Sequence, residues 1–227
     1  MADSDEYTYE IIDNESDARD CAQLLAEEFV LHNSIDIYHR MSIQQYYDIL
    51  MWPMLKEVLN ERLSFLSRHQ SSGEIVGVIL AGDMYLHQQK HPYEPNSPPQ
   101  WIPLDDLLDE MAHEFICHDF NQELISGILL HIALGATRVS HSGKGIATKL
   151  RKTLYNYARD IRNFQYAFVQ VNSEATRHIY LNILQGKELT VVNPTTWLWK
   201  KKDNGLFYPY KDYKGELISN ILIKLTK

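Results

Sequence analysis

The chain has 227 residues, of which 44% are hydrophobic and 23% charged, and its formal net charge is −8. This length predicts one elaborated domain rather than two, and the apolar fraction is sufficient for a sizeable core, which excludes a wholly disordered or low-complexity chain. No run of about 18 apolar residues occurs, so neither a transmembrane helix nor a membrane partner is expected. The acidic balance argues against a nucleic-acid partner, because neutralising phosphates requires a basic face. It is compatible with a cationic small substrate.

The cysteines and the N-terminal residues bear on location. Cys21 and Cys117 are too few for a disulfide framework, which is typical of a reduced, cytoplasmic protein. Met1–Glu6 is acidic and polar, unlike a secretory signal or a transit peptide, and is expected to be a disordered tail. We therefore expect a cytoplasmic protein with one domain over residues 1–227, either a monomer or a homodimer.

The first hundred residues show the periodicities of helices and strands. In chain order they predict a strand over 7–12, a helix over 18–30, a helical stretch over 42–60, and a β-hairpin over 63–67 and 75–80. Asn14 is a favourable N-cap for the first helix, and Pro53 interrupts the second helical stretch. Five prolines between residues 85 and 103 predict a long irregular surface loop, because proline lacks the amide hydrogen that regular structure uses.

The second half alternates helices and strands. It predicts a helix over 104–118, a strand over 126–134, a helix over 145–161, a strand over 166–171, a helix over 175–184, and strands over 189–198 and 217–225. The runs 126–134 and 166–171 are continuously apolar, as expected for strands buried on both faces. The absence of an internal repeat or linker predicts one mixed α/β domain.

The stretch with the clearest chemistry is Val139-Ser-His-Ser-Gly-Lys-Gly-Ile-Ala-Thr148, between a buried strand and a helix. Its two glycines let the backbone curl so that several amides point outward at one spot. The first amides of a helix have no intrahelical partners, and the helix dipole adds roughly half a positive charge there. The stretch therefore predicts a diphosphate site. Basic side chains that could neutralise a further phosphate are Lys144, Lys149, Arg151 and Lys152.

Other site types fit less well. A Walker A loop needs glycine where Arg138 stands and serine or threonine where Gly145 stands. A dinucleotide fingerprint needs three glycines in an early βαβ unit, whereas Gly143 and Gly145 come late in the chain. His113 and His118 are five residues apart rather than the four that helical zinc sites use, so no metal is expected.

The loop Ser142-Gly-Lys-Gly-Ile-Ala147 resembles the coenzyme A loop of the GNAT superfamily of N-acetyltransferases, (Gln/Arg)-x-x-Gly-x-(Gly/Ala). The hairpin strand Ile75-Val-Gly-Val-Ile and the unit Phe168-Val-Gln-Val-Asn172, followed by Tyr180, are also similar to units of that superfamily. Thr176-Arg-His-Ile-Tyr180 and Tyr208-Pro-Tyr-Lys-Asp-Tyr213 look like the arylalkylamine N-acetyltransferase branch.

The chain also departs from the superfamily pattern. Ser142 replaces the leading glutamine or arginine, which removes one side-chain contact but leaves the backbone cradle. The segment Ile183-Leu-Gln-Gly-Lys187 lacks the usual Gly-Phe ending, and the spacing from Asn172 to Tyr180 is one residue longer than usual.

The resemblance implies a mostly antiparallel twisted sheet with a central, splayed parallel strand pair, flanked by helices. Acetyl-CoA would be the cosubstrate, with its pantetheine arm in the gap between the splayed strands. The cofactor-binding residues implied are the main chain near Thr137, Arg138 and Val139 for the arm, Ser142, Gly143, Lys144, Gly145, Ile146, Ala147 and Thr148 for the pyrophosphate, and Asn172 and Thr176 in the second unit.

The implied reaction is direct attack of an amine on the thioester carbonyl. Tyr180 is the candidate that protonates the departing thiolate, since a phenol can donate from the helix beside the splay. In some arylalkylamine enzymes a glutamate follows the first helix, but the matching position is Asn33, and an amide cannot be a general base. His32, Glu28 or a water chain would replace it, and His32 is the candidate we carry forward.

Three functions follow from these expectations. The first is acetyl transfer to a small primary amine of the arylalkylamine or polyamine type. The second is acetylation of a protein lysine or N-terminal amine. The third is binding of acyl-CoA without catalysis.

Overall fold

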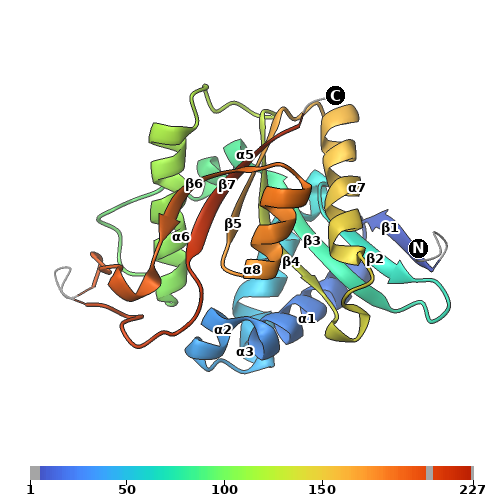
Figure 1. Cartoon of the computed structure of the whole chain (residues 1–227), viewed down its shortest axis with the longest axis horizontal. Coiled ribbons are helices and arrows are strands. Elements are labelled where there is room, and N and C mark those ends of the chain that lie inside the picture. The colour runs from blue at the N-terminus through green and yellow to red at the C-terminus, as the bar shows by residue number, and fades with distance from the viewer. Residues whose placement is uncertain (1–5, 203–206, 226–227) are drawn as a thin grey trace.

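A computed structural model describes residues 6–202 and 207–225. It contains one seven-stranded sheet in the order β1-β2-β3-β4-β5-β7-β6 (Figure 1). The strands are β1 (Tyr7–Ile11), β2 (Phe65–His69), β3 (Ile75–Asp83), β4 (Leu129–Thr137), β5 (Tyr166–Val171), β6 (Lys187–Val192) and β7 (Ile218–Lys224). Neighbouring strands pair antiparallel except β4 and β5, which are parallel. The predicted mixed, mostly antiparallel sheet with one central parallel pair is confirmed.

The helices surround this sheet. They are α1 (Glu15–His32), α2 (Ser34–His39), α3 (Ile43–Tyr46), α4 (Trp52–Val58), α5 (Met84–Lys90), α6 (Pro103–Glu114), α7 (Ile146–Asp160) and α8 (Glu174–His178). Single π-helical turns follow α3, α6 and α8, at Tyr47–Met51, Phe115–Asp119 and Ile179–Ile183. Asn14 caps α1 as predicted, its side chain accepting a hydrogen bond from the Asp17 amide at 2.9 Å. None of the helices among the described residues has the length and apolarity that crossing a membrane requires.

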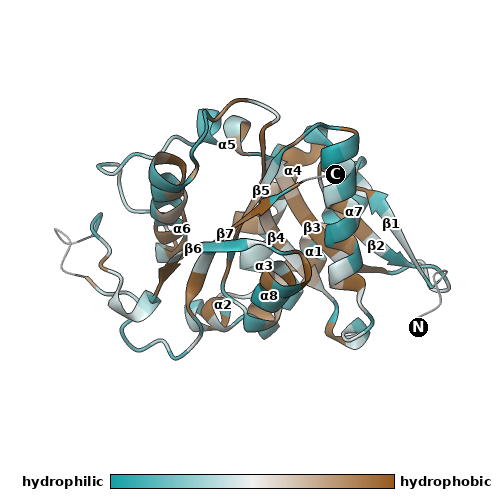
Figure 2. Cartoon of the chain, turned by 45° about the horizontal axis from the view of Figure 1, so that its top comes forward, coloured by the Kyte–Doolittle hydropathy of each residue, from teal (hydrophilic) through white to brown (hydrophobic). Residues whose placement is uncertain are grey.

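Two helical layers cover the two faces of the sheet (Figure 1). Leu150 and Leu154 of α7 pack with Ile79 of β3 on one face, where α8 also lies. Leu25 of α1 packs with Val78 of β3 on the other face. Successive residues of β3 thus serve opposite layers, as the alternation of a strand requires. The central strands and the inner sides of the helices are accordingly hydrophobic (Figure 2).

The segment between β3 and α6 corrects one prediction. Residues 85–103 were expected to be irregular throughout, but Met84–Lys90 forms α5. Asp83 caps this helix, its side chain accepting a hydrogen bond from the Tyr85 amide at 3.0 Å. The prolines that deny regular structure begin only at Pro92, so the irregular segment is 91–102. Proline content therefore describes only the second part of this segment.

Other boundaries also shift. β4 begins at Leu129, three residues after the predicted start, and β6 ends at Val192, six residues before the predicted end. The short helix α2 was not predicted. Glu6, assigned to a disordered tail, forms an ion pair with Lys144 at 2.9 Å, whereas the rest of that segment, residues 1–5, lies outside the described residues.

Candidate functional site

The loop before α7 has the conformation that the two glycines predicted. Gly143 and Gly145 both adopt left-handed backbone angles, with φ of 76° and 78°. An added Cβ would meet nothing within 4 Å at either position, so both glycines face open space. Behind them Ile146, the first residue of α7, is buried against Tyr7 and Val76 and fixes the helix start on the sheet.

The amides of this loop are free to bind a ligand. Among the described residues, none of the amides of residues 143–147 donates a hydrogen bond, and the Lys149 amide, bonded to the Gly145 carbonyl at 3.0 Å, is the first of α7 to be satisfied. Residues 142–145 are exposed. A group of unpaired amides at the start of a 15-residue helix is suited to an anion, because the helix dipole acts in the same direction.

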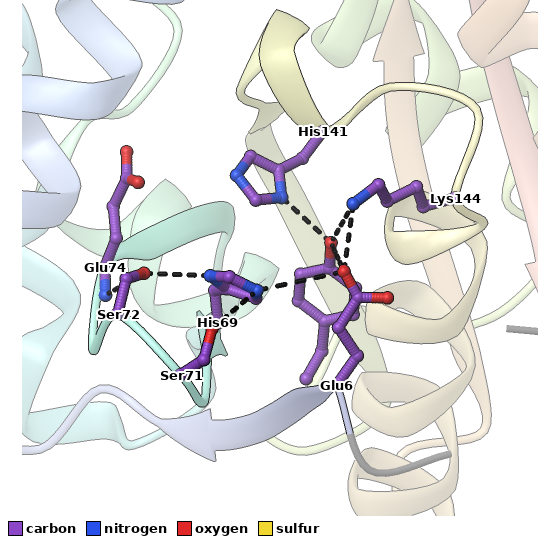
Figure 3. Close-up of polar contacts among 8 residues, drawn as sticks. Glu6, His69, Ser71, Ser72, Glu74, His141 and Lys144 are labelled. Carbon is purple, nitrogen blue, oxygen red and sulfur yellow. Dashed lines mark hydrogen bonds and ion pairs between the residues drawn. The ribbon is translucent and has the colours of Figure 1, made fainter. Parts of the chain in front are cut away.

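The side chains of His141 and Lys144 are held beside the loop by contacts with the N-terminal segment (Figure 3). Lys144 donates to Glu6 at 2.9 Å and to the Tyr7 hydroxyl at 3.0 Å, and His141 lies 2.9 Å from the same hydroxyl. These contacts hold the pKa of Glu6 below its ordinary value and raise that of Lys144. The Ser142 hydroxyl donates to the Val139 carbonyl of its own turn. The loop therefore offers main-chain donors, with one partly neutralised lysine beside them.

The two parallel strands diverge next to this loop. β4 and β5 pair from Leu129↔Tyr166 to Ile132↔Val169, after which β4 continues along β3 alone. The Arg138 amide, just past β4, bonds to the Val76 carbonyl on the β3 side at 2.8 Å. Because hydrogen-bonding directions alternate along a strand, the main-chain groups of Thr137 and Gly135 face the other edge, where β5 no longer pairs. This unpaired edge can bond an extended ligand as an added strand would.

Arg138 and Val139, also named for the pantetheine arm, lie just beyond the end of β4. The Arg138 guanidinium turns toward α1 and pairs with Glu27, with Glu28 at 3.8 Å and with Glu74 at 3.3 Å. Val139 lies in an exposed single turn after β4. Of the three residues named for the arm, Thr137 has its main-chain groups toward the splay, whereas the Arg138 amide is already bonded to β3.

Tyr180 is placed on the α7 side of the sheet by the π-helical turn after α8. Tyr180 is the second residue of that turn, which closes with a hydrogen bond from the Leu184 amide to the Ile179 carbonyl. The Tyr180 side chain is fully buried, and its hydroxyl lies within reach of the Arg151 guanidinium but has no acceptor for its own proton. Burial raises the pKa of the phenol, and the positive charge of Arg151 opposes that rise. Thr176 lies one turn earlier, in α8, and is partly exposed.

Arg151 corrects a second prediction. It was expected, with Lys144, Lys149 and Lys152, to be available to a further phosphate beside the loop, but only 5% of it is exposed. Its guanidinium points inward and lies over the ring of Tyr180, 5.0 Å from the ring centroid. Lys149 and Lys152 remain on the exposed side of α7.

Asn33, between α1 and α2, and Asn172, just after β5, link the α1 side of the sheet to the end of β5. Their side-chain amides bond reciprocally, with nitrogen-to-oxygen distances of 3.1 and 3.2 Å. Asn33 also caps α2 by accepting from the Ile35 amide at 3.2 Å. His32, the preceding residue, is half-exposed and lies 3.8 Å from Glu28. No contact among the described residues brings His32 to Tyr180, so the two predicted catalytic side chains are not brought together directly.

An acidic and aromatic cluster lies at the far end of α2. An open surface cavity of about 260 Å³ is lined by His39, Met41, Trp101, Ile102 and Pro103. His39 contacts buried Asp36 at 3.7 Å and the Tyr210 hydroxyl at 2.9 Å.

Asp105, which follows the cavity lining in sequence, makes no side-chain hydrogen bond or ion pair within the described residues. Burial and the nearby charges of Asp109, Asp106 and Asp36 raise its pKa to about 7. This cluster was missed because its members are spread over α2, α6 and the segment after β6.

One group of possible metal ligands occurs among the described residues: Glu57, His87 and His91, whose ligand atoms lie within 4.8 Å of one another. Glu57 is already bonded to His91 at 3.0 Å and lies 3.5 Å from Lys90. The i, i+4 spacing of His87 and His91 was visible in the sequence, but it fell in the segment expected to be a loop.

Solved structures of other proteins have a similar fold. The C-terminal condensation domain of Ebony, solved with β-alanyl-dopamine, is 16% identical over 96% of this chain and 99% of its own, with a TM-score of 0.73. A putative arylalkylamine N-acetyltransferase from the mosquito Aedes aegypti is 12% identical over 97% and 88%, with a TM-score of 0.70. The Drosophila melanogaster polyamine N-acetyltransferase is 14% identical over 96% and 99%, with a TM-score of 0.64.

These likenesses establish that the chain has the fold of the GNAT acetyltransferases. Neither a protein-family model nor a curated protein sequence matches the chain. The fold that the loop motif predicted is thus confirmed by structure.

Proposed function

We propose that this protein is an acetyl-CoA-dependent N-acetyltransferase that transfers an acetyl group directly to a primary amine of a small molecule. The observation that carries the proposal is the row of unpaired amides at residues 143–147, which adjoins the unpaired edge of β4. The first feature suits a diphosphate and the second suits an extended amide-containing arm. Coenzyme A has both groups in this order.

The acidic and aromatic cluster supports a cationic acceptor. Asp36 is buried and Asp105 is partly buried, with Tyr38, Tyr210 and Tyr213 packed around one another nearby. Carboxylates and aromatic faces both favour an ammonium group. α2 leads from the Asn33–Asn172 pair to this cavity and has six residues, a length of about 9 Å. An arylalkylamine or a polyamine could therefore reach from the cavity to the splay.

Calorimetry with acetyl-CoA, followed by an assay of thiol release over panels of amines and peptides, tests this proposal. We expect micromolar binding of acetyl-CoA, and release of coenzyme A thiol with arylalkylamines or polyamines. Cys117 is exposed and would react with the thiol reagent, so the assay uses a Cys117→Ser variant, while Cys21 is buried with a strongly raised pKa.

The alternatives predict different results. Release with peptides alone would indicate a protein lysine or N-terminal acetyltransferase. Binding without release for any amine would indicate an acyl-CoA-binding protein without catalysis. Absence of acetyl-CoA binding would contradict the whole assignment.

A further inference from the structure

Arg151 is a buried charge without a counter-ion. Its Nη1 donates to the Ala147 carbonyl of its own helix at 2.9 Å, and its Nε has no hydrogen-bond partner. No carboxylate within the described residues forms an ion pair with it. A buried guanidinium is normally paired, because removing a charge from water is costly unless an opposite charge compensates. The buried charge of Arg151 would therefore be compensated by a bound anion.

Two further polar groups beside Arg151 are also unsatisfied. The Tyr155 hydroxyl, one turn along α7, is buried and has no hydrogen-bond partner. The Tyr180 hydroxyl is buried within hydrogen-bonding reach of the Arg151 guanidinium, which can only donate to it, so its own O–H has no acceptor. Buried polar groups are rarely left unpaired in native proteins. The charge of Arg151 acts on both phenols and opposes the increase in pKa that burial causes. Three unsatisfied donors thus gather around one position.

This position lies directly behind the splayed part of β4. A Cβ added to Gly135 would come within 3.2 Å of Arg151 Nη2, so the guanidinium lies close against the strand at Gly135. Gly135 is three residues beyond Ile132, the last β4 residue that pairs with β5. Arg151 is also one helical turn from Ala147 in the anion-binding loop. The guanidinium therefore stands between the proposed diphosphate site and the region where β4 and β5 part.

We propose that Arg151, together with the hydroxyls of Tyr155 and Tyr180, forms an anion site that receives the sulfur of coenzyme A when the thioester breaks. The inference rests on the proposed function. During transfer, the amine nitrogen bonds to the carbonyl carbon, the carbon–sulfur bond breaks with its electron pair on sulfur, and the amine proton leaves to solvent. The sulfur departs as a thiolate held by Arg151, and it can later take a proton from the Tyr180 hydroxyl, which solvent then restores.

The first test is the titration of the coenzyme A thiol bound to the wild-type chain, followed by thiolate absorbance in the ultraviolet. An opposite charge within about 4–6 Å lowers a pKa by roughly one to three units. We expect the bound thiol to ionise that far below the free thiol. An unshifted titration, with coenzyme A bound, would overturn the inference and leave the proposed function intact. If neither coenzyme A nor acetyl-CoA binds, the proposed function fails as well.

Substitutions then assign the effect to Arg151. Arg151→Met keeps the length of the side chain and removes its charge, and it should abolish the shift of the thiol titration and lower kcat about 100-fold with little change in KM for acetyl-CoA. Arg151→Lys should retain much of the shift. Arg159→Met, which removes a charge two turns further along α7, is the matched control and should leave the titration unchanged. An Arg151→Met variant that keeps the wild-type shift contradicts the inference. Should that variant not fold, the wild-type titration and Arg151→Lys still decide.

Discussion

Among single residues, Gly145 determines whether the loop can accept a phosphate. Its left-handed φ and the open space before it leave the neighbouring amides accessible. We predict that Gly145→Glu lowers the affinity for acetyl-CoA by at least about 100-fold, because the side chain blocks the cradle and its charge repels the diphosphate. Titration calorimetry measures the loss.

Gly73→Glu is the control for this substitution. Gly73 lies in the turn between β2 and β3, has a φ of 74° and has nothing within 4 Å of an added Cβ, so the variant carries the same backbone strain and the same charge outside the loop. Both variants should be destabilised by about 1 kcal/mol. Equal acetyl-CoA affinities for the two would show that the loop does not bind the diphosphate.

The two glycines and the basic charges of the loop could be recognised in the sequence, because a glycine pair before an amphipathic helix has a local meaning. The orientation of Arg151 could not. Whether it faces solvent or Tyr180 depends on the space left by Gly135 and on the π-helical turn that carries Tyr180. Both are distant in the sequence from α7.

At the scale of elements, one pair of side chains ties α2 to the end of β5. Asn33 both caps α2 and exchanges two hydrogen bonds with Asn172. We predict that Asn33→Ala lowers the free energy of unfolding by about 1–2 kcal/mol through loss of the cap and of the amide pair. Asn172→Ala should cost less, since it removes the pair and leaves the cap.

A double-mutant cycle in urea isolates the pair. The two losses should not add, with a coupling of about 0.5–1.5 kcal/mol. Asn14→Ala, which removes the α1 cap alone, is the matched variant and should be additive with Asn172→Ala. Additivity of Asn33→Ala with Asn172→Ala would mean that the amide pair contributes nothing to joining the two elements.

The sequence predicts the long elements well and the short ones poorly. Helix α7 and strand β5 have strong periodicity or continuous apolar character, and both lie where expected. The helices α2 and α5 have only six and seven residues, so their stability comes from tertiary packing rather than from their own pattern. The prolines that follow α5, from Pro92 onward, also favoured an irregular segment where α5 forms.

At the scale of the whole molecule, folding brings Asp36, Asp105, Asp106 and Asp109 together from two helices. Asp106 is compensated by Lys201 at 2.7 Å, whereas Asp105 has no ion pair among the described residues. The folded chain therefore holds a carboxyl group that resists ionisation, a cost that a bound cation would remove. An amine bound in the cavity beside Asp105 would supply that cation.

The raised pKa of Asp105 predicts how stability depends on pH. The folded value of about 7 exceeds the ordinary 3.8, so the folded state retains a proton that the unfolded state loses. The stability from this proton is full below about pH 4 and is lost as the pH rises through 7. Asp105→Asn removes this dependence, and we predict that it raises the free energy of unfolding at pH 8 by at least about 1 kcal/mol, with a smaller gain toward pH 4.

Urea unfolding from pH 4 to 8 measures this change in stability, with substitution of the exposed Asp48, Asp48→Asn, as control. An Asp105→Asn variant that is no more stable than the wild type at pH 8 would contradict the raised pKa of Asp105. The same variant should also bind the amine acceptor more weakly, and unchanged amine binding would contradict the placing of the ammonium group beside Asp105.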